Sequence, residues 1–88
     1  MININLVIKM DLCEIKNKCY FILGLPSEYY SFMVVDFNDD FIYEVKNNAL
    51  VVSKGHFKGV ITKRDQLYIT VDTKEYTLIP DFEVSMVD

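Results

Sequence analysis

Residues 41–53 read FIYEVKNNALVVS and carry the strongest local signal in the chain. Two runs rich in β-branched and aromatic side chains flank Asn47-Asn48, and asparagine tolerates the positive φ that a two-residue type I′ turn needs. The sequence therefore predicts a β-hairpin. Its register places four apolar side chains on one half-buried face as two cross-strand pairs, Val45 with Leu50 and Tyr43 with Val52.

A second hairpin is predicted nearer the C-terminus. Leu67, Ile69 and Val71 alternate with polar or aromatic residues, and Thr73-Lys74 forms the turn that follows them. Between the two hairpins we expect a glycine-containing loop over 54–59, a strand over 60–62 and a turn over 64–66. The expected pairs of the second hairpin are Val71 with Tyr76, Ile69 with Leu78, and Leu67 with Pro80.

Short strands account for most of the remaining chain. Residues 2–12 alternate between apolar and mostly polar side chains, which is typical of a strand. Residues 19–25 are expected to form a more buried strand, in which Gly24 marks a bulge or a close backbone approach. The other expected elements are polar turns over 14–18 and 38–40, a helical turn over 27–30 capped by Ser27, and strands over 31–37 and 82–86.

Together these segments predict an all-β fold, a single small antiparallel barrel or sandwich of seven to eight short strands without a convincing helix. A chain of 88 residues fits a single domain that spans residues 1–88. The predicted core consists of apolar residues on the inward faces of these strands: Ile4, Leu6, Ile8, Ile22, Val34, Val45, Leu50, Val52, Ile61, Ile69, Val71, Leu78 and Val84.

The segment 54–87 also resembles a known architecture. It runs Lys54-Gly55-x-Phe57-x-Gly59-Val60-Ile61, then Leu67-x-Ile69-x-Val71-Asp72, then Tyr76-x-Leu78-Ile79-Pro80, a short corner and Val84. This order of a glycine-containing strand, a meander and an Ile-Pro corner is similar to that of the small SH3-like and Sm-like barrels. The resemblance implies an SH3-like C-terminal half, and barrels of this kind bind peptides, RNA, DNA or other proteins.

Composition excludes several classes of protein. Hydrophobic residues make up 51% of the chain and charged residues 25%, which rules out an intrinsically disordered protein. No apolar run approaches the roughly 20 residues of a membrane-spanning helix, and the N-terminus lacks the features of a secretory signal. We therefore expect a cytoplasmic protein with reduced Cys13 and Cys19 and without a membrane partner.

No set of residues indicates catalysis. Cys13 and Cys19 have neither the spacing nor the number of partners of a structural zinc site. The sole histidine, His56, has no carboxylate near it in the sequence. Asp39 and Asp40 are a pair of neighbouring carboxylates, but a turn explains them. We expect a protein that is not an enzyme and that needs neither a metal nor a cofactor.

Charge is unevenly distributed along the chain, whose formal net charge is −4. Residues 36–44 contain four acids and no base, and tyrosine, which is enriched at protein interfaces, occurs in and near this segment. We therefore hypothesise a non-enzymatic protein-interaction module that meets a basic partner protein. In size and acidity it is similar to small phage or mobile-element inhibitors. The candidate partner-binding residues are Tyr29, Tyr30, Asp36, Asp39, Asp40, Tyr43 and Glu44.

Two alternative functions stay open. Residues 54–64 contain four cations and no acid, so the chain could be a small-barrel nucleic-acid-binding protein that contacts phosphates and stacks on a base. The second alternative is a small-molecule or nucleotide-binding site in the mouth of the barrel. Exposed strand edges would also allow a homodimer. The residues for nucleic-acid binding would be Lys54, His56, Phe57, Lys58, Lys63 and Arg64.

Overall fold

The structure, a computed structural model, describes residues 11–80. The predicted strand over 82–86 and all but the end of the strand predicted over 2–12 lie outside the described residues. The same holds for four of the predicted core residues: Ile4, Leu6, Ile8 and Val84. The described part of the chain is mostly β-structure with two short helices, which confirms the all-β prediction.

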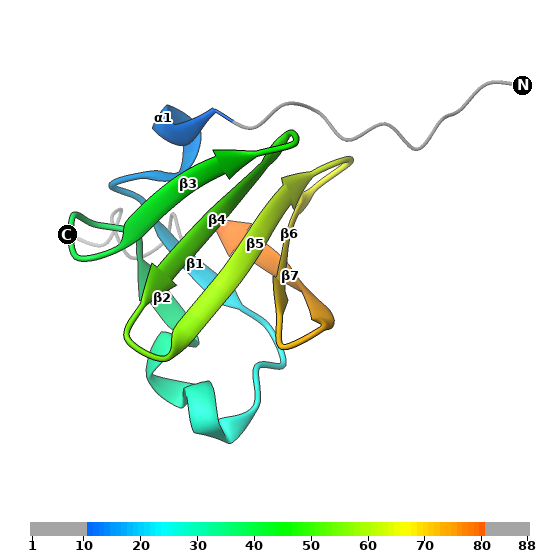
Figure 1. Ribbon diagram of the computed structural model, residues 1–88. Coiled ribbons are helices and arrows are strands. Elements are labelled where there is room, and N and C mark those ends of the chain that lie inside the picture. The colour runs from blue at the N-terminus through cyan, green and yellow to red at the C-terminus, as the bar shows by residue number, and fades with distance from the viewer. Residues whose placement is uncertain (1–10, 81–88) are drawn as a thin grey trace, which may run out of the picture.

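Seven antiparallel strands form one curled, half-barrel sheet within residues 11–80, in the order β2-β1-β7-β6-β5-β4-β3 (Figure 1). The two helices are α1 (Leu12–Ile15) and the 3-10 helix η1 (Ser27–Phe32). The strands are β1 (Cys19–Ile22), β2 (Val34–Asp36), β3 (Ile42–Lys46), β4 (Ala49–Lys54), β5 (Phe57–Lys63), β6 (Leu67–Val71) and β7 (Lys74–Pro80).

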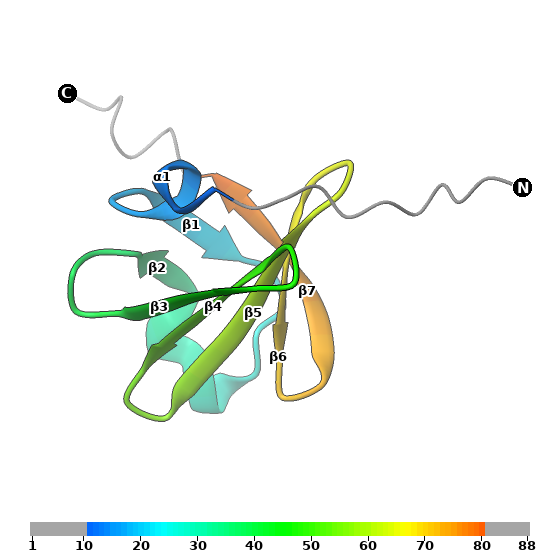
Figure 2. The same cartoon turned by 45° about the horizontal axis from the view of Figure 1, so that its top comes forward.

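The curl of the sheet brings its two edge strands, β2 and β3, toward each other, and residues 37–41 connect them (Figure 2). No ladder of hydrogen bonds joins β2 to β3 among the described residues. The helices cover the ends of the half-barrel, with α1 at one end and η1 at the other (Figure 1). Within residues 11–80 the sheet is thus a half-barrel without backbone pairing between β2 and β3.

Aromatic side chains fill the interior beside the β2–β3 connection. Phe37 and Phe41, at the two ends of the connection, are 0% and 5% exposed, and their rings meet edge to face with centroids 5.2 Å apart. Phe32 of η1 stacks on Phe57 of β5 at 4.3 Å, and Phe57 also meets Phe41 edge-on at 6.3 Å. Such contacts add to the hydrophobic gain of burying the rings. The aromatic cluster (Phe32, Phe37, Phe41 and Phe57) therefore seals the side that hydrogen bonds leave open.

The first hairpin has the predicted turn and register. Asn47 and Asn48 have φ of 46° and 65°, and the pairs Tyr43–Val52 and Val45–Leu50 are both present. Leu50 and Val52 are fully buried. The prediction that Val45 belongs to the core is wrong, since it is 52% exposed. The reason is that β3 is an edge strand and has no neighbour on its far side within residues 11–80.

Val34 is also wrongly predicted as a core residue, because it is 51% exposed while Val35 is 2% exposed. The two valines are adjacent on β2, and alternation places one of them on each face of the sheet. Val35 pairs with the buried Tyr20, which fixes the inward face of this strand. Because residues 32–35 are all apolar and do not alternate, the sequence does not show which side chains of β2 face the core.

The predicted register of the second hairpin is wrong by two residues. The observed pairs are Val71–Lys74, Ile69–Tyr76 and Leu67–Leu78. A two-residue turn at Asp72-Thr73, with φ of 56° and 70°, replaces the longer turn that was expected. Because side chains alternate with period two, the shift leaves each residue on its predicted face. Ile69, Val71 and Leu78 are accordingly buried, as expected.

The expected loop over 54–59 is instead the turn of a further hairpin, in which only Gly55 and His56 separate β4 from β5. Phe57 pairs with Lys54 and is fully buried. Gly59 lies inside β5, where a Cβ would come within 2.6 Å of the Cδ1 atom of Ile69. This glycine therefore serves close packing between β5 and β6 and not the flexibility of a loop.

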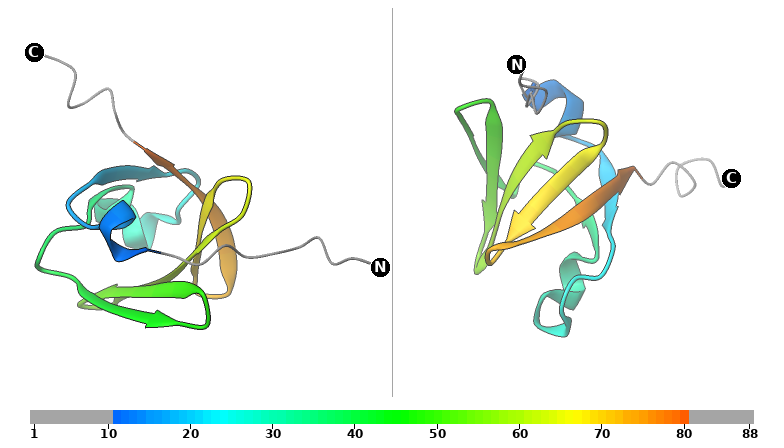
Figure 3. Two further views of the ribbon diagram at one scale, coloured as in Figure 1. Left: turned by 90° about the horizontal axis from the view of Figure 1, so that it is seen from above. Right: turned by 90° about the vertical axis from the view of Figure 1, so that its right-hand side faces the viewer.

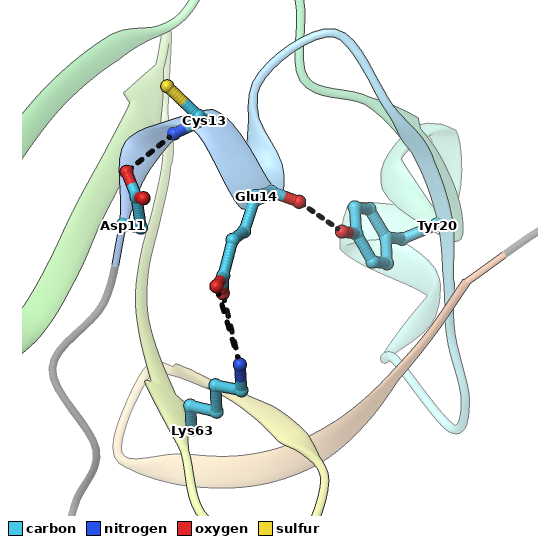
Figure 4. Close-up of polar contacts among 5 residues, drawn as sticks. All are labelled: Asp11, Cys13, Glu14, Tyr20 and Lys63. Carbon is cyan, nitrogen blue, oxygen red and sulfur yellow. Dashed lines mark hydrogen bonds and ion pairs between the residues drawn. The ribbon is translucent and has the colours of Figure 1, made fainter.

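Helix α1 occupies part of the segment that was expected to be a polar turn. The carboxylate of Asp11 accepts a hydrogen bond from the Cys13 backbone N–H and caps the helix, and Ile15 is fully buried (Figure 4). The Tyr20 hydroxyl donates to the Glu14 carbonyl oxygen at 3.0 Å, and Lys63 Nζ lies 3.2 Å from the Glu14 carboxylate. These contacts hold α1 over one end of the barrel.

The helical turn predicted at 27–30 is present and extends to Phe32 as η1. Ser27 does not cap it, since Pro26 occupies the N-cap position without a side-chain hydrogen bond. Gly24 has φ of 84° and lies in the turn after β1, not in a strand bulge. Cys13 and Cys19, both within the described residues, do not form a disulfide.

A core substitution tests the inward face. We expect Ile69→Ala to lower the free energy of unfolding by about 2–4 kcal/mol, because it leaves a cavity at a fully buried position. The matched change Ile42→Ala, at a side chain that is 70% exposed, should cost about 1 kcal/mol or less. Urea unfolding followed by circular dichroism measures both, and equal losses would contradict the assigned faces.

Backbone strain at Thr73 gives a second test. A β-branched residue at φ of 70° is strained, and asparagine adopts this conformation at lower cost. We expect Thr73→Asn to raise the free energy of unfolding by about 0.5–1 kcal/mol. Thr70→Asn, at an extended position of β6, is the control and should give no gain. A loss of stability in Thr73→Asn would contradict the assigned turn.

Candidate functional site

The connection between β2 and β3 is a fixed loop whose tip carries two acids. Phe37 and Phe41 anchor its ends in the aromatic cluster. Asn38 organises the tip, since its Oδ1 atom accepts a hydrogen bond from the Asp40 N–H at 2.8 Å. Its carbonyl oxygen accepts one from the Tyr43 hydroxyl at 2.7 Å. Core packing therefore sets where the Asp39 and Asp40 carboxylates project.

The carboxylates of this region are exposed and paired with lysines. The side chains of Asp39 and Asp40 are 85% and 70% exposed. Asp39 lies 3.0 Å from Lys16, the C-cap residue of α1, and Asp40 lies 3.8 Å from Lys54 of β4. Ion pairs this exposed contribute only about 0–1 kcal/mol each. Cations of a binding partner can therefore replace these lysines at small cost.

Tyr43 of β3 links these acids to the fold. Lys16 Nζ lies 5.6 Å from the centroid of its ring. Burial, and then the nearby Asp39 and Asp36 carboxylates, raise the pKa of the Tyr43 hydroxyl to about 12. The hydroxyl therefore stays protonated at neutral pH and keeps donating to Asn38. We name Asp36, Asp39, Asp40 and Tyr43 the acidic seam.

The structure separates the predicted partner-binding residues into groups. Tyr29 lies on η1, meets Phe57 edge-on at 6.0 Å, and donates a hydrogen bond to the Asp72 carboxylate at 3.4 Å. Tyr30 follows it on the same helix and is 67% exposed. Glu44 lies on β3, where it pairs with Lys46 at 3.8 Å. Only the acidic seam gathers around the β2–β3 connection, and Glu44 adjoins it.

Sequence reasoning missed the open edge of β3 as part of this site. Within residues 11–80 this strand pairs only with β4. Ile42 and Val45 on it are 70% and 52% exposed. An unpaired edge with exposed apolar side chains is a ready surface for another strand. Hydrophobic alternation predicts a strand, but it does not show which strands end up at the edges of a sheet.

The cations predicted to contact nucleic acid do not gather into one patch. Lys63 pairs with Glu14, as Figure 4 shows, and Lys54 pairs with Asp40. The Arg64 guanidinium lies 3.0 Å from Glu75 and 4.1 Å from the Tyr68 ring centroid. Lys63 is the last residue of the seven-residue strand β5, whereas Lys54 pairs with Phe57 at its start, so the two lysines lie at opposite ends of β5. Phe57 is fully buried and has no face for a base to stack on.

Two open hollows lie at opposite ends of the β5–β7 region. His56 and Lys58 line one of them, a hollow of about 360 Å³ shared with Tyr29 and the Asp72-Thr73 turn. Among the described residues Lys58 has no ion-pair partner. The other hollow, of about 320 Å³, has Leu67, Leu78, Ile79 and Pro80 among its lining residues. Each has the size of a small-molecule site, but neither is enclosed.

Comparison of the chain with protein-family models, with curated proteins and with solved structures gives no match. None of the helices in residues 11–80 is long and apolar enough to cross a membrane. The same residues contain no group of three or more His, Cys, Asp or Glu side chains placed to hold a metal ion.

Titration of Tyr43 tests the geometry of the acidic seam. Its pKa should lie near 12 in the folded protein, against an ordinary value of 10.0. Because the folded-state pKa is the higher one, the stabilising effect of the neutral hydroxyl is complete below pH 10 and is lost as the pH rises through 12.

The double variant Asp36→Asn/Asp39→Asn should lower this pKa but leave it above 10.0, because burial is the largest cause of the shift. Ring resonances of Tyr43 followed by NMR at alkaline pH, and assigned with Tyr43→Phe, measure the effect. An ordinary pKa for Tyr43 in the folded parent protein would contradict the described contacts.

Proposed function

We propose that this protein is a non-enzymatic interaction module that binds a basic protein surface through the acidic seam and the adjoining edge of β3. One observation carries the proposal. Core packing holds the loop that carries two strongly exposed carboxylates beside a sheet edge that is unpaired within residues 11–80 and on which Ile42 is 70% exposed. A pre-organised loop loses little conformational entropy on binding, so less of the interaction energy is spent on ordering it.

Each part of this surface has a separate role in binding. Lysines or arginines of the partner replace Lys16 and Lys54 as the counter-ions of Asp39 and Asp40, which sets the orientation and the rate of association. Ile42 supplies apolar area next to them, and Tyr43 presents a half-buried ring. The backbone of β3 offers hydrogen-bonding groups to an extended segment of the partner.

Inhibition is one consequence of binding of this kind. A small acidic domain that covers a basic groove keeps other anions, including nucleic acid, out of that groove. A direct role in nucleic-acid binding is the second candidate. Lys58 and His56, which share one hollow, favour it, whereas the ion pairs of Lys54, Lys63 and Arg64 weigh against it.

Neutralising the acidic seam tests the proposed function. We expect the triple variant Asp36→Asn/Asp39→Asn/Asp40→Asn to lose at least about tenfold in affinity for captured partners, because each lost charge contact at such an interface is worth several tenths of a kcal/mol or more. Affinity capture from the native host, quantified by mass spectrometry, compares the parent with the variant.

The matched control is Glu28→Gln/Asp72→Asn/Glu75→Gln, which changes the net charge equally at exposed acids on other elements. If the control variant and the triple variant capture a partner equally poorly, the result would contradict a specific role of the acidic seam in binding. Titration with single-stranded RNA and DNA at low salt separates the second candidate. Tight binding that weakens steeply with salt, and that Lys58→Gln reduces, would favour nucleic acid over protein.

A further inference from the structure

The hairpin turn determines which backbone groups of β3 face its open edge. Lys46 and Ala49 flank the two-residue turn and form a hydrogen-bonded pair, as such turns require. Hydrogen-bonded pairs then recur at every second residue, so Glu44 and Ile42 also direct their N–H and C=O groups toward β4. The intervening residues, Tyr43 and Val45, direct theirs toward the open edge. Figure 3 (right) shows this green hairpin at one side of the molecule.

A second copy of β3 can pair with this edge in only a few ways. Antiparallel pairing about a two-fold axis must match outward-directed groups with each other, so the axis passes through Tyr43, Glu44 or Val45. An axis at Glu44 places that carboxylate against its own copy, which is unfavourable. An axis at Tyr43 sets Glu44 opposite the apolar Ile42. An axis at Val45 sets Glu44 opposite Lys46 twice, and the charges then complement each other.

We propose that a second copy of this chain pairs with β3, antiparallel and with Val45 on the two-fold axis. The inference rests on the proposed function of this face in protein interaction and names one partner for it. Val45, which is 52% exposed in the single chain, then contacts its own copy. Glu44 and Lys46, which now pair within one strand at 3.8 Å, exchange partners across the interface. The sheet continues through both molecules.

The acidic seams stay accessible in this arrangement. Asp39 and Asp40 precede β3 by two to three residues, whereas the axis lies near its other end. The dimer therefore presents two acidic seams, one at each outer end of the shared hairpins. Because the second copy takes the backbone groups of the β3 edge, the dimer would bind a basic partner through its two acidic seams, with the gain in overall affinity that two linked sites give. The short length of β3 makes this a concentration-dependent dimer.

Charge reversal across the interface tests the proposal. Glu44→Lys gives a strand with two lysines, and Lys46→Glu gives one with two glutamates. Each variant alone should dimerise at least about tenfold more weakly than the parent, because both cross-strand pairs become repulsive. An equimolar mixture of the two variants should dimerise again, and so should the double variant Glu44→Lys/Lys46→Glu. Sedimentation equilibrium over a series of protein concentrations measures all four.

Two further variants keep the test decisive. The Val45→Lys variant should not dimerise. The Lys18→Glu variant, which changes an exposed lysine outside β3, should dimerise as the parent does. Circular dichroism confirms that each variant folds. A parent that stays monomeric at every concentration overturns the proposal, and so does a mixture that fails to restore the dimer. A monomer in which the Val45 amide resists hydrogen exchange would show that another strand covers the edge, which also overturns it.

The outcomes for self-pairing and for the proposed function are distinguishable. If the parent is monomeric but the triple seam variant loses captured partners, self-pairing is refuted and the interaction module stands. If the dimer forms and responds to charge reversal, but the seam variant and its control capture the same proteins equally, the seam loses its role and the dimer stands.

Discussion

The aromatic cluster is the interaction on which the rest of the structure depends. Seven strands curl almost into a barrel, yet β2 is only three residues long and makes no ladder with β3 among the described residues. Phe32, Phe37, Phe41 and Phe57 occupy that side instead, with ring contacts between 4.3 and 6.3 Å. Without these rings the interior would open to water, and the loop that carries the acidic seam would lose both of its anchors.

The sequence predicts some features of this fold well and others poorly, and the hairpins show why. Asn47-Asn48 predicts a turn correctly because asparagine tolerates positive φ. Thr73 also has a positive φ, although a β-branched residue disfavours it, so the sequence does not indicate the second turn. The second register was therefore two residues off. The buried faces survived that error, because an even shift preserves alternation. Val45 was wrongly predicted because burial at the edge of a sheet depends on neighbours far away in the chain. Val34 was wrongly predicted because the apolar run around it does not show which of its side chains face inward.

Parts of the candidate site can be predicted from local sequence, and other parts depend on contacts between distant residues. Asp36, Asp39, Asp40 and Tyr43 are close in sequence, so the turn that holds the acids could be found by inspection. The role of Tyr43 as a donor to Asn38, and the open edge beside it, follow from packing that no local pattern encodes. Phe57 looked like an exposed aromatic between two lysines, but the short Gly55-His56 turn brings it into the core. The cations of residues 54–64 are close in sequence but do not form one patch, because β4 and β5 carry them to opposite ends of the sheet.

Lys16 gives the acidic seam a mechanical connection to the end of the barrel. Lys16 is the C-cap residue of α1, and its ammonium group lies close to Asp39 and the Tyr43 ring. Glu14, within the helix, contacts Lys63 and the Tyr20 hydroxyl. A ligand that takes Asp39 away from Lys16 therefore removes one of the tethers of α1. Four residues of helix have little cooperativity of their own. Binding at the acidic seam would thus loosen α1, the helix that covers this end of the barrel, and would leave the sheet unchanged.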